Sequence, residues 1–346
     1  MYSEAELQSA VSAGAISREA AQALRDHANG MRNAPVADEE HFRLITGFND
    51  IFVTIAAVLL LVACAGIGGA IAAGAGGLLV AGAAWLMAEF FTRKRRMALP
   101  SIVLLLAFVG GVIAIPIELI EATDPHFSDQ VTALIGAGIA ALAGLATLLH
   151  WRRFMVPITV AAGTAALAGT AVALIMAAVQ PMVGRDGMEN VLLWLLFGAG
   201  LIVFGIAMRW DMSDRARETR RSDVAFWLHL LAAPMIAHPL FHALGVTEGQ
   251  NISALAALGV VVIYVLLGLV ALAVDRRALL VSALAYVLTA MTLLFRQFGM
   301  VELNVALTGL VIGSALLTLS AFWGPIRRAV VSPLPDQWRG RLPATA

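Results

Sequence analysis

The chain has 346 residues, of which 60% are hydrophobic and only 13% are charged, and its formal net charge at pH 7 is zero. Soluble domains carry about 25% charged residues, so most of this chain's surface is expected to face lipid. The balanced charge gives no overall attraction to nucleic acid, which is not an expected partner. The single cysteine, Cys64, excludes an intrachain disulfide and a cysteine-cluster metal site.

Residues 1–48 are polar and predict a small cytoplasmic helical hairpin followed by a linker. Ser3 and Glu6 fit a capping box, Gly14 fits a helix end, and Ser17 fits the start of a second helix. The expected apolar seam is formed by Leu7, Val11, Ile16, Ala20 and Leu24. A DNA-reading helix-turn-helix is the sharper alternative, but the segment lacks a basic face. A cytoplasmic cap or a hairpin that docks a cytoplasmic protein is therefore favoured.

Ten apolar stretches follow, each close to the roughly 20 residues that a helix needs to cross a bilayer. Residues 51–91 are about twice that length and have a glycine-rich middle, which predicts two helices joined by a tight turn. The expected spans cover about residues 51–70, 72–91, 98–120, 131–150, 155–178, 191–209, 224–245, 252–274, 278–295 and 304–323. The predicted fold class is an all-α polytopic bundle over residues 49–323 that contacts the lipid bilayer.

The basic residues alternate between successive loops. If the N-terminus is cytoplasmic, every one of the 23 lysine and arginine residues except Arg185 and Arg296 lies on a cytoplasmic segment. This pattern follows the positive-inside rule and predicts that both termini are cytoplasmic. The tail, residues 324–346, is expected to be flexible, with Arg327 and Arg328 near anionic head groups.

The seventh expected span, VAFWLHLLAAPMIAHPLFHALG over residues 224–245, contains three histidines. Ionisable side chains at membrane depth are costly, so each is a candidate functional residue. His238 and His242 lie four residues apart on one helix face, a spacing that can bind one metal ion. His229 lies about 13 Å deeper and points to the opposite side of a straight helix. The three histidines therefore do not predict a single metal site.

A polar pocket open to the outer face is the main candidate site. Glu118 lies near the outer end of the third span, and Arg296 closes the ninth. Together with His238 and His242 they could line such a pocket, because all four lie toward the outer side. A carboxylate beside a histidine favours the protonated imidazole and makes a proton relay. The alternative is that Glu118 pairs with Arg296 and the histidines have only structural partners.

Three prolines inside the spans predict helix kinks: Pro116 in the third span, and Pro234 and Pro239 in the seventh. The structural alternative for the histidines uses these kinks, because a proline frees backbone carbonyls that a neighbouring histidine can satisfy. On the inner side, Glu89 and Arg93 are four residues apart and predict a helix-end ion pair. His150 next to Trp151 predicts an interfacial histidine.

Two stretches resemble a known group of proteins. The hairpin LQSAVSAGAISREAAQAL followed by HFRLITGFNDIFVTIA, and later FWLHLLAAPMIAHPLFH, are similar to a family of uncharacterised predicted bacterial polytopic inner-membrane proteins. The resemblance covers most of the chain. It implies a bacterial inner-membrane location and this topology, and it implies no activity.

Three functions stay open from the sequence. The first is a carrier for a small solute or ion, proton-coupled through His238, His242 and Glu118. The second is a membrane protein that binds a metal or a non-covalent haem through the same histidines. The third is an envelope scaffold or sensor whose hairpin docks a cytoplasmic protein. The chain has no P-loop, no HExxH and no Gly-x-Ser-x-Gly motif, so an enzyme is not favoured.

Overall fold

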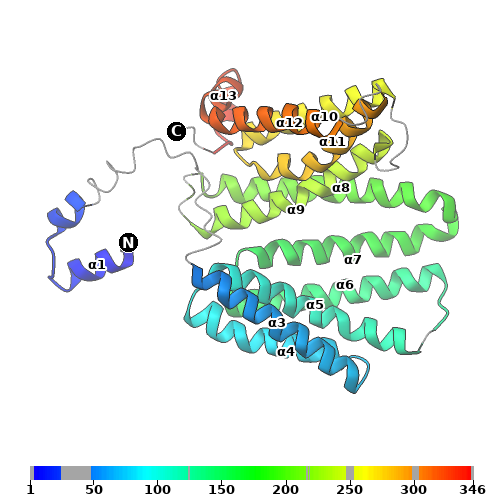
Figure 1. Cartoon of the computed structure of the whole chain (residues 1–346). Helices are drawn as coiled ribbons and strands as arrows, with labels where there is room; N and C mark the ends of the chain where they lie inside the picture. The colour runs from blue at the N-terminus through cyan, green and yellow to red at the C-terminus, as the bar shows by residue number, and fades with distance from the viewer. Residues whose placement is uncertain are drawn as a thin grey trace. The chain divides into compact units, whose positions relative to one another are not determined.

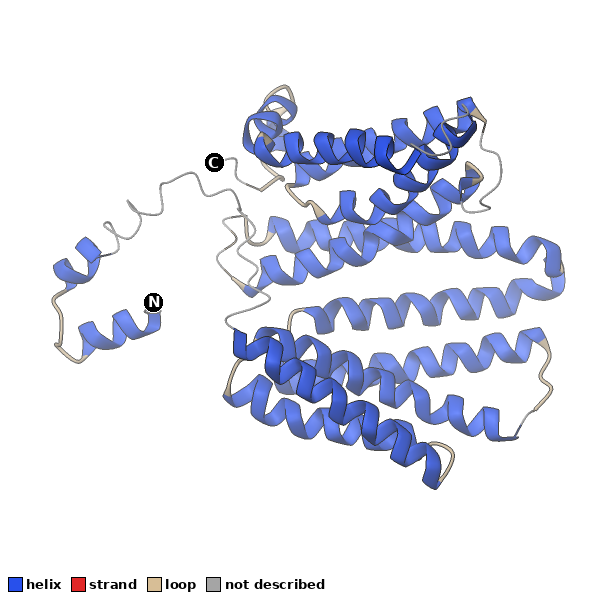
Figure 2. Ribbon diagram, in the orientation of Figure 1, coloured by secondary structure: helices blue, strands red, loops and turns tan. Residues whose placement is uncertain are grey.

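The structure is a computed structural model of the chain, and it describes residues 4–24, 48–123, 125–215, 217, 219–246, 253–297 and 304–343. Within these ranges all regular secondary structure is helical and no strand occurs (Figure 2). The chain divides into two compact units, Met1–Phe42 and Arg43–Ala346. The described residues therefore agree with the all-α class.

The first unit contains α1 (Glu4–Ser12) and a second helical segment, residues 18–24. Gly14 has a φ of +70°, a left-handed conformation that glycine adopts without steric cost just after a helix. The hydroxyl of Ser17 accepts a hydrogen bond from the amide of Ala20 at 3.1 Å. Both of these predicted caps are confirmed, whereas Ser3 of the predicted capping box lies outside the described residues.

The apolar seam of this hairpin differs by one position from the predicted one. Leu7 is 4% exposed and Ala21 is 1% exposed, while Ala20 faces solvent and Leu24 is 38% exposed. One residue is about 100° of rotation on a helix. The second helix therefore turns Ala21 rather than Ala20 toward α1.

The second unit holds the apolar helices in the expected order (Figure 1). They are α3 (Phe48–Ile71), α4 (Ala75–Ala88), which continues into the π-helix η1 (Glu89–Lys94), α5 (Ala98–Thr123), α6 (Asp129–Phe154), α7 (Ile158–Val183), α8 (Arg185–Met212), α9 (Arg220–Ala243), α10 (Ala254–Val274), α11 (Ala278–Gln297) and α12 (Asn304–Ala321). Two short helices follow, α13 (Trp323–Val331) and α14 (Asp336–Arg339).

Eight of the described helices are long and apolar enough to cross a membrane, or nine if the bent pair α12 and α13 forms one span. Each of the ten expected stretches holds a helix, but α11 contributes only a shorter apolar helix, Leu279–Leu293. The protein is thus a multi-pass membrane protein with at least eight candidate spans, and the count of ten stays a prediction.

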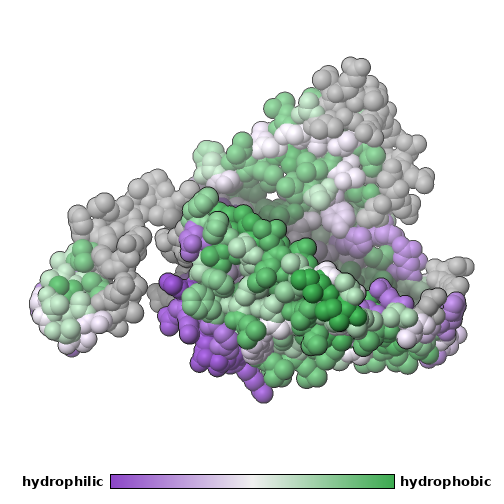
Figure 3. Space-filling view, turned by 60° about the horizontal axis from the view of Figure 1, so that its bottom comes forward, coloured by the Kyte–Doolittle hydropathy of each residue, from purple (hydrophilic) through white to green (hydrophobic). Residues whose placement is uncertain are grey.

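Large apolar side chains cover the outside of these helices. Leu59, Val62, Leu145 and Ile202 are each at least 60% exposed, which would be costly in water. In Figure 3 most of the visible face of the helices is hydrophobic, and strongly hydrophilic residues gather toward its edges. This distribution is what a lipid-facing bundle requires.

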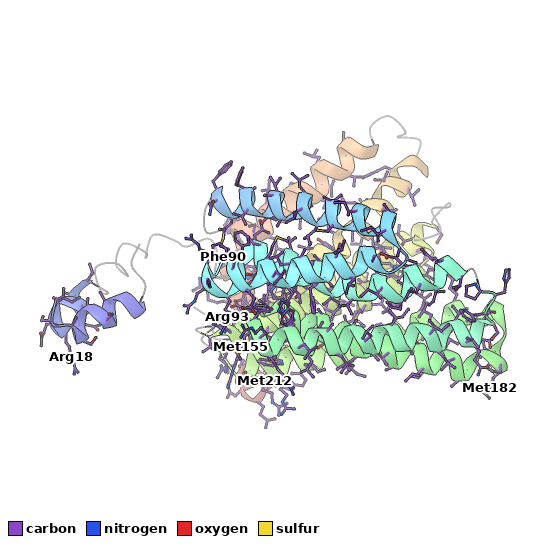
Figure 4. All side chains as sticks on the ribbon, turned by 90° about the horizontal axis from the view of Figure 1, so that it is seen from below. Arg18, Phe90, Arg93, Met155, Met182 and Met212 are labelled. Carbon is purple, nitrogen blue, oxygen red and sulfur yellow. The ribbon has the colours of Figure 1, made fainter. Side chains whose placement is uncertain are left out.

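The ends of the helices differ in charge. Figure 4 shows Arg93, Met155 and Met212 at one end of the bundle and Met182 at the other. Met155 lies two residues after Arg153, and Met212 lies near further arginines of the α8–α9 loop. Arginines therefore concentrate at one end, called the arginine-rich end below.

Helices α4 and α5 approach each other closely through glycine. A Cβ atom on Gly111 would lie 2.7 Å from the backbone oxygen of Gly77, and one on Gly77 would lie 2.6 Å from the oxygen of Gly111. Gly74, with a φ of +82°, makes the turn from α3 into α4. The glycine-rich middle of residues 51–91 thus forms the predicted turn and also a backbone contact between helices.

The predicted kink positions Pro116, Pro234 and Pro239 all lie inside described helices, Pro116 in α5 and the other two in α9. Helix α7 contains a further proline, Pro181. Neighbouring helices and side chains can satisfy the backbone groups that a proline frees. Helix α9 accordingly stays helical through both of its prolines.

The tail is more ordered than the sequence suggests. Helix α12 and helix α13 meet at a bend of 77°, and the buried residues of α13 are Trp323, Arg327 and Val331, spaced four apart on one face. Arg327 is 2% exposed and donates to the carbonyl oxygens of Leu272 at 3.2 Å and Pro343 at 2.9 Å. Arg327 therefore ties the tail to α10, and only Arg328 is exposed as expected.

Candidate functional site

Helix α9 is the most enclosed of the candidate spans. In its most apolar 18-residue stretch 61% of the residues are buried, against 17–33% in the other seven spans. It packs against α7, α8 and α11. Protein rather than lipid therefore surrounds the helix that carries three of the chain's seven histidines, and polar side chains can find partners there.

His229 lies in the arginine-rich half of α9 and is completely buried. Its Nε2 atom lies 2.8 Å from Oδ2 of Asp211, at the end of α8, and the Asp211 side chain is only 1% exposed. The ring of Phe204 stands edge-on to the imidazole, with 5.2 Å between the ring centroids. The histidine thus has one polar partner and an otherwise apolar environment.

Arg276 binds the same carboxylate. Its Nη2 donates to Oδ1 of Asp211 at 2.5 Å, and its Nε donates to Oδ2 at 3.4 Å. The same Nη2 also donates to the carbonyl oxygen and the hydroxyl of Ser222 in the first turn of α9, both at 3.1 Å. With a side chain 3% exposed, Arg276 joins α8, α9 and the α10–α11 turn. A buried charge needs such pairing and hydrogen bonding to be tolerated.

These contacts determine where the proton of His229 lies. The guanidinium of Arg276 is always charged and stabilises Asp211 as a carboxylate, which can only accept hydrogen bonds. Nε2 of His229 therefore carries the hydrogen and donates it to Asp211. Nδ1 is buried and has no hydrogen-bond partner among the described residues. A second proton on this histidine would therefore bind at Nδ1.

The α10–α11 turn organises a second cluster beside the first. Asp275 ends α10 with a φ of +59°, and its carboxylate accepts hydrogen bonds from Nη1 of Arg217 at 2.8 Å and from Nε1 of Trp323 at 2.7 Å. The guanidinium of Arg277 lies 5.0 Å from the centre of the Trp323 ring. Successive residues of one turn thus contact the α8–α9 loop, α8, α9 and α13.

The other two histidines of α9 lie near each other, as their spacing predicts. Their ring centroids are 6.3 Å apart. Nδ1 of His238 lies 2.8 Å from the hydroxyl of Tyr286 on α11, and Nε2 of His242 lies 3.3 Å from Oε1 of Glu189 on α8. Glu189 is 74% exposed, so this pair lies close to the surface. It also lies toward the end of α9 opposite His229.

A metal site would need more ligands than this pair provides. In the described ranges no three or more His, Cys, Asp or Glu side chains are placed to hold a metal ion. Protein zinc sites use three or four side chains. His238 and His242 therefore stay a two-residue ligand set, and His229 is held separately by Asp211, in line with the geometric argument from the sequence.

Glu118 has a different environment from the histidines. Its Oε1 accepts a hydrogen bond from the amide of Gly77 in the first turn of α4 at 3.1 Å, while α5 packs against α3, α4 and α6. Its Oε2 is buried without a partner among the described residues. The structure thus gives Glu118 the role of an N-terminal cap on α4 and shows no contact with His238 or His242. The Arg296 side chain lies outside what the structure describes, so its pairing with Glu118 stays a prediction.

Two further sequence predictions concern the arginine-rich end. The predicted pair of Arg93 and Glu89 is present at 3.3 Å, and Arg153 adds two hydrogen bonds to the same carboxylate at 2.6 and 2.9 Å. His150 is completely buried rather than interfacial. Its Nδ1 lies 3.3 Å from the hydroxyl of Thr159, and its ring is surrounded by Trp85, Phe108 and Phe154.

The sequence does not indicate the partners of His229. Asp211 and Ser222 belong to no recognisable motif, and Arg276 has the pattern of an ordinary basic loop residue. One signal was available, because Asp211 is an acidic residue directly after the interfacial Trp210 and beside a segment rich in arginines. A carboxylate at that place predicts pairing with a cation from another loop, but the sequence does not say which one.

No protein-family model matches the chain, and no curated protein or solved structure matches it.

Proposed function

We propose that this multi-pass membrane protein is a carrier for a small solute or ion, coupled to protons through α9. The observation that carries the proposal is the buried contact between His229 and Asp211 on the most enclosed helix, where Arg276 binds the same carboxylate. We place the protein in a bacterial inner membrane with both termini cytoplasmic, because the alternation of arginines favours that orientation.

Proton binding at His229 would change how the helices are held. A proton at Nδ1 turns the imidazole into a cation, and two cations then share the carboxylate of Asp211. Oδ2 already accepts from both Nε2 of His229 and Nε of Arg276. Electrostatic interactions are strong in a buried, weakly polarisable site. The added charge would therefore shift Arg276 away from Asp211 and toward Ser222, which biases the position of α9 against the α10–α11 turn.

The two ends of α9 suit access from opposite sides of the membrane. His238 and His242 lie toward one end, where Glu189 reaches the surface, and His229 lies toward the arginine-rich end. Nine residues of helix separate His229 from His238, about 13 Å, too far for a direct hydrogen bond. A carrier with alternating access opens its binding site to one side of the membrane at a time, and we assign the two histidine sites of α9 to the two sides.

The test of this proposal measures solute-dependent proton movement in proteoliposomes. The purified protein is reconstituted with a pH-sensitive dye inside the vesicles, and amino acids, dicarboxylates, sugars and monovalent cations are added in turn outside. The proposal expects at least one solute class to move protons beyond the rate in protein-free vesicles. A correctly folded protein that moves protons with none of these classes would contradict it.

A second candidate function, docking of a cytoplasmic protein, is favoured by a separate observation. The unit Met1–Phe42 is compact by itself, and Leu7 and Ala21 are buried, which favours a module that docks a cytoplasmic protein. Deleting residues 1–42 should then leave transport intact while a partner is lost. If the deletion abolishes transport as well as partner binding, the unit is part of the carrier itself. The metal- or haem-binding alternative has no supporting observation of this kind.

A further inference from the structure

An apolar groove lies between α11 and the bend from α12 to α13. Its cavity volume is about 180 Å³. Its walls come from two faces, one on α11 and one on α12, formed by Leu280, Val281, Leu284, Leu316 and Leu319. An engineered apolar cavity of about 150 Å³ binds benzene, so this groove has room for several methylene groups of a hydrocarbon chain.

One end of the groove is polar and aromatic. Arg277 and Trp323 both line it, with the guanidinium of Arg277 over the indole at 5.0 Å from the ring centre. The Trp323 ring is itself fixed, because its Nε1 donates to Asp275. Figure 1 shows α13 at the end of the bundle where α3 begins, which is the arginine-rich end. A tryptophan and an arginine at this level mark the boundary between hydrocarbon and head groups.

We propose that this groove binds one anionic phospholipid, with an acyl chain along the leucines of α11 and α12 and its phosphate at Arg277. The apolar walls match the chain, and the guanidinium matches the head group. Guanidinium groups bind phosphate oxygens through two parallel hydrogen bonds and stack on aromatic rings. The occupant comes from the leaflet at the arginine-rich end, since only that end of the groove carries the cation.

The bend gives the groove its shape. A straight continuation of α12 would leave the bundle, but the 77° turn into α13 brings Trp323 back against α10 and closes one end of the groove. Helix α13 is held there by Trp323, Arg327 and Val331 on its buried face. The groove is therefore built by described contacts within this chain. It shares Arg277 and Trp323 with the cluster at the α10–α11 turn, and none of the α9 histidines lines it.

The test measures retained lipid by native mass spectrometry. The full-length protein is purified in mild detergent, exchanged to a stable delipidated state, and titrated separately with phosphatidylglycerol and phosphatidylcholine. The wild type should bind one phosphatidylglycerol in preference to phosphatidylcholine. Arg277→Gln should bind phosphatidylglycerol about tenfold more weakly, as expected for loss of a charged hydrogen bond, and Arg277→Lys should restore part of the preference.

Neighbouring residues provide matched controls. Leu316 lines the groove and Leu317, which is 73% exposed on the same helix, does not. Leu316→Trp should fill the groove and abolish the single tight binding event, while Leu317→Trp should not. Arg209→Gln removes the same charge from an exposed position at the same end and should have no effect. Equal binding of both lipids by the wild type, or equal loss in Leu316→Trp and Leu317→Trp, would overturn the proposal.

Discussion

His229 donates from Nε2 to Oδ2 of Asp211 across 2.8 Å, and neither side chain is more than 1% exposed. The contact joins α9 to the end of α8, and Arg276 extends it to the α10–α11 turn. A carboxylate, a permanent cation and a titratable ring therefore meet where three parts of the bundle are packed together. Under the proposed function, α9 is the element whose position depends on a proton.

The Asp211 carboxylate should be essential for stability. In Asp211→Asn the guanidinium of Arg276 stays buried without its counter-charge. Breaking a buried ion pair by removing one partner costs about 3–5 kcal/mol of stability. We expect a marked fall in the apparent melting temperature in mild detergent, and a smaller fall for the double change Asp211→Asn with Arg276→Gln. Asp336→Asn, in an exposed pair with Arg339, is the control and should change little. Equal melting of Asp211→Asn and wild type would refute the pairing.

The contact between α4 and α5 should tolerate a methyl group at one glycine and reject it at the next. A Cβ on Gly111 meets backbone atoms of α4 at 2.7 Å, whereas one on Gly110 meets nothing within 4 Å. Because backbone cannot move aside as a side chain can, Gly111→Ala should cost about 1–3 kcal/mol, and Gly110→Ala should be neutral or slightly stabilising. Thermal unfolding of the two variants side by side checks this. Similar effects at both positions would mean that the helices are further apart.

Arg327 should control access to the tail. Its guanidinium holds the carbonyl of Pro343 and that of Leu272, so Arg327→Gln loosens the chain after α13, which then keeps the contact of Arg215 with the carbonyl of Leu342. Trypsin should then cut after Arg339 and Arg341 faster than in the wild type, by mass spectrometry of the time course. Arg328→Gln removes the same charge from an exposed neighbour and should leave the rate unchanged. The anchoring role fails if the two variants are cut alike.

The hydroxyl of Tyr286 should be coupled to His238. The two are 2.8 Å apart, and hydrogen bonds between membrane helices average about 0.6 kcal/mol in double-mutant cycles. A cycle of Tyr286→Phe and His238→Ala should give a coupling of that order, because Phe keeps the ring that stacks on Phe241. Strictly additive effects on unfolding would show that the contact contributes nothing.

Much of the architecture follows from local properties of the sequence. Hydropathy and glycine turns indicate where the apolar helices lie along the chain, since a membrane span must satisfy its own backbone and therefore has a characteristic length. The caps at Gly14 and Ser17 are local as well, so sequence alone predicts them. The i, i+4 pairs of Glu89 with Arg93 and of His238 with His242 are predictable for the same reason.

The contacts between distant segments could not be predicted in this way. The partner of His229 is 18 residues away, and that of Asp211 in the α10–α11 turn is 65 residues away. In sequence, the turn that contains Arg276 and the tail that contains Arg327 cannot be told apart from arginine-containing loops that are exposed to solvent. Only the packing of α8, α9 and α10 decides which arginine is buried. The predicted grouping of Glu118 with the histidines depends on their shared depth, but depth does not determine which helices are neighbours.

The most direct test of the account compares His229→Gln with His126→Gln in the proteoliposome assay. Glutamine keeps a donor for Asp211 but cannot take up a proton, and His126 is an exposed histidine outside the helices. We predict that His229→Gln stays folded and loses solute-dependent proton movement, while His126→Gln moves protons like the wild type. Undiminished proton movement in His229→Gln would contradict the claim that α9 carries the proton.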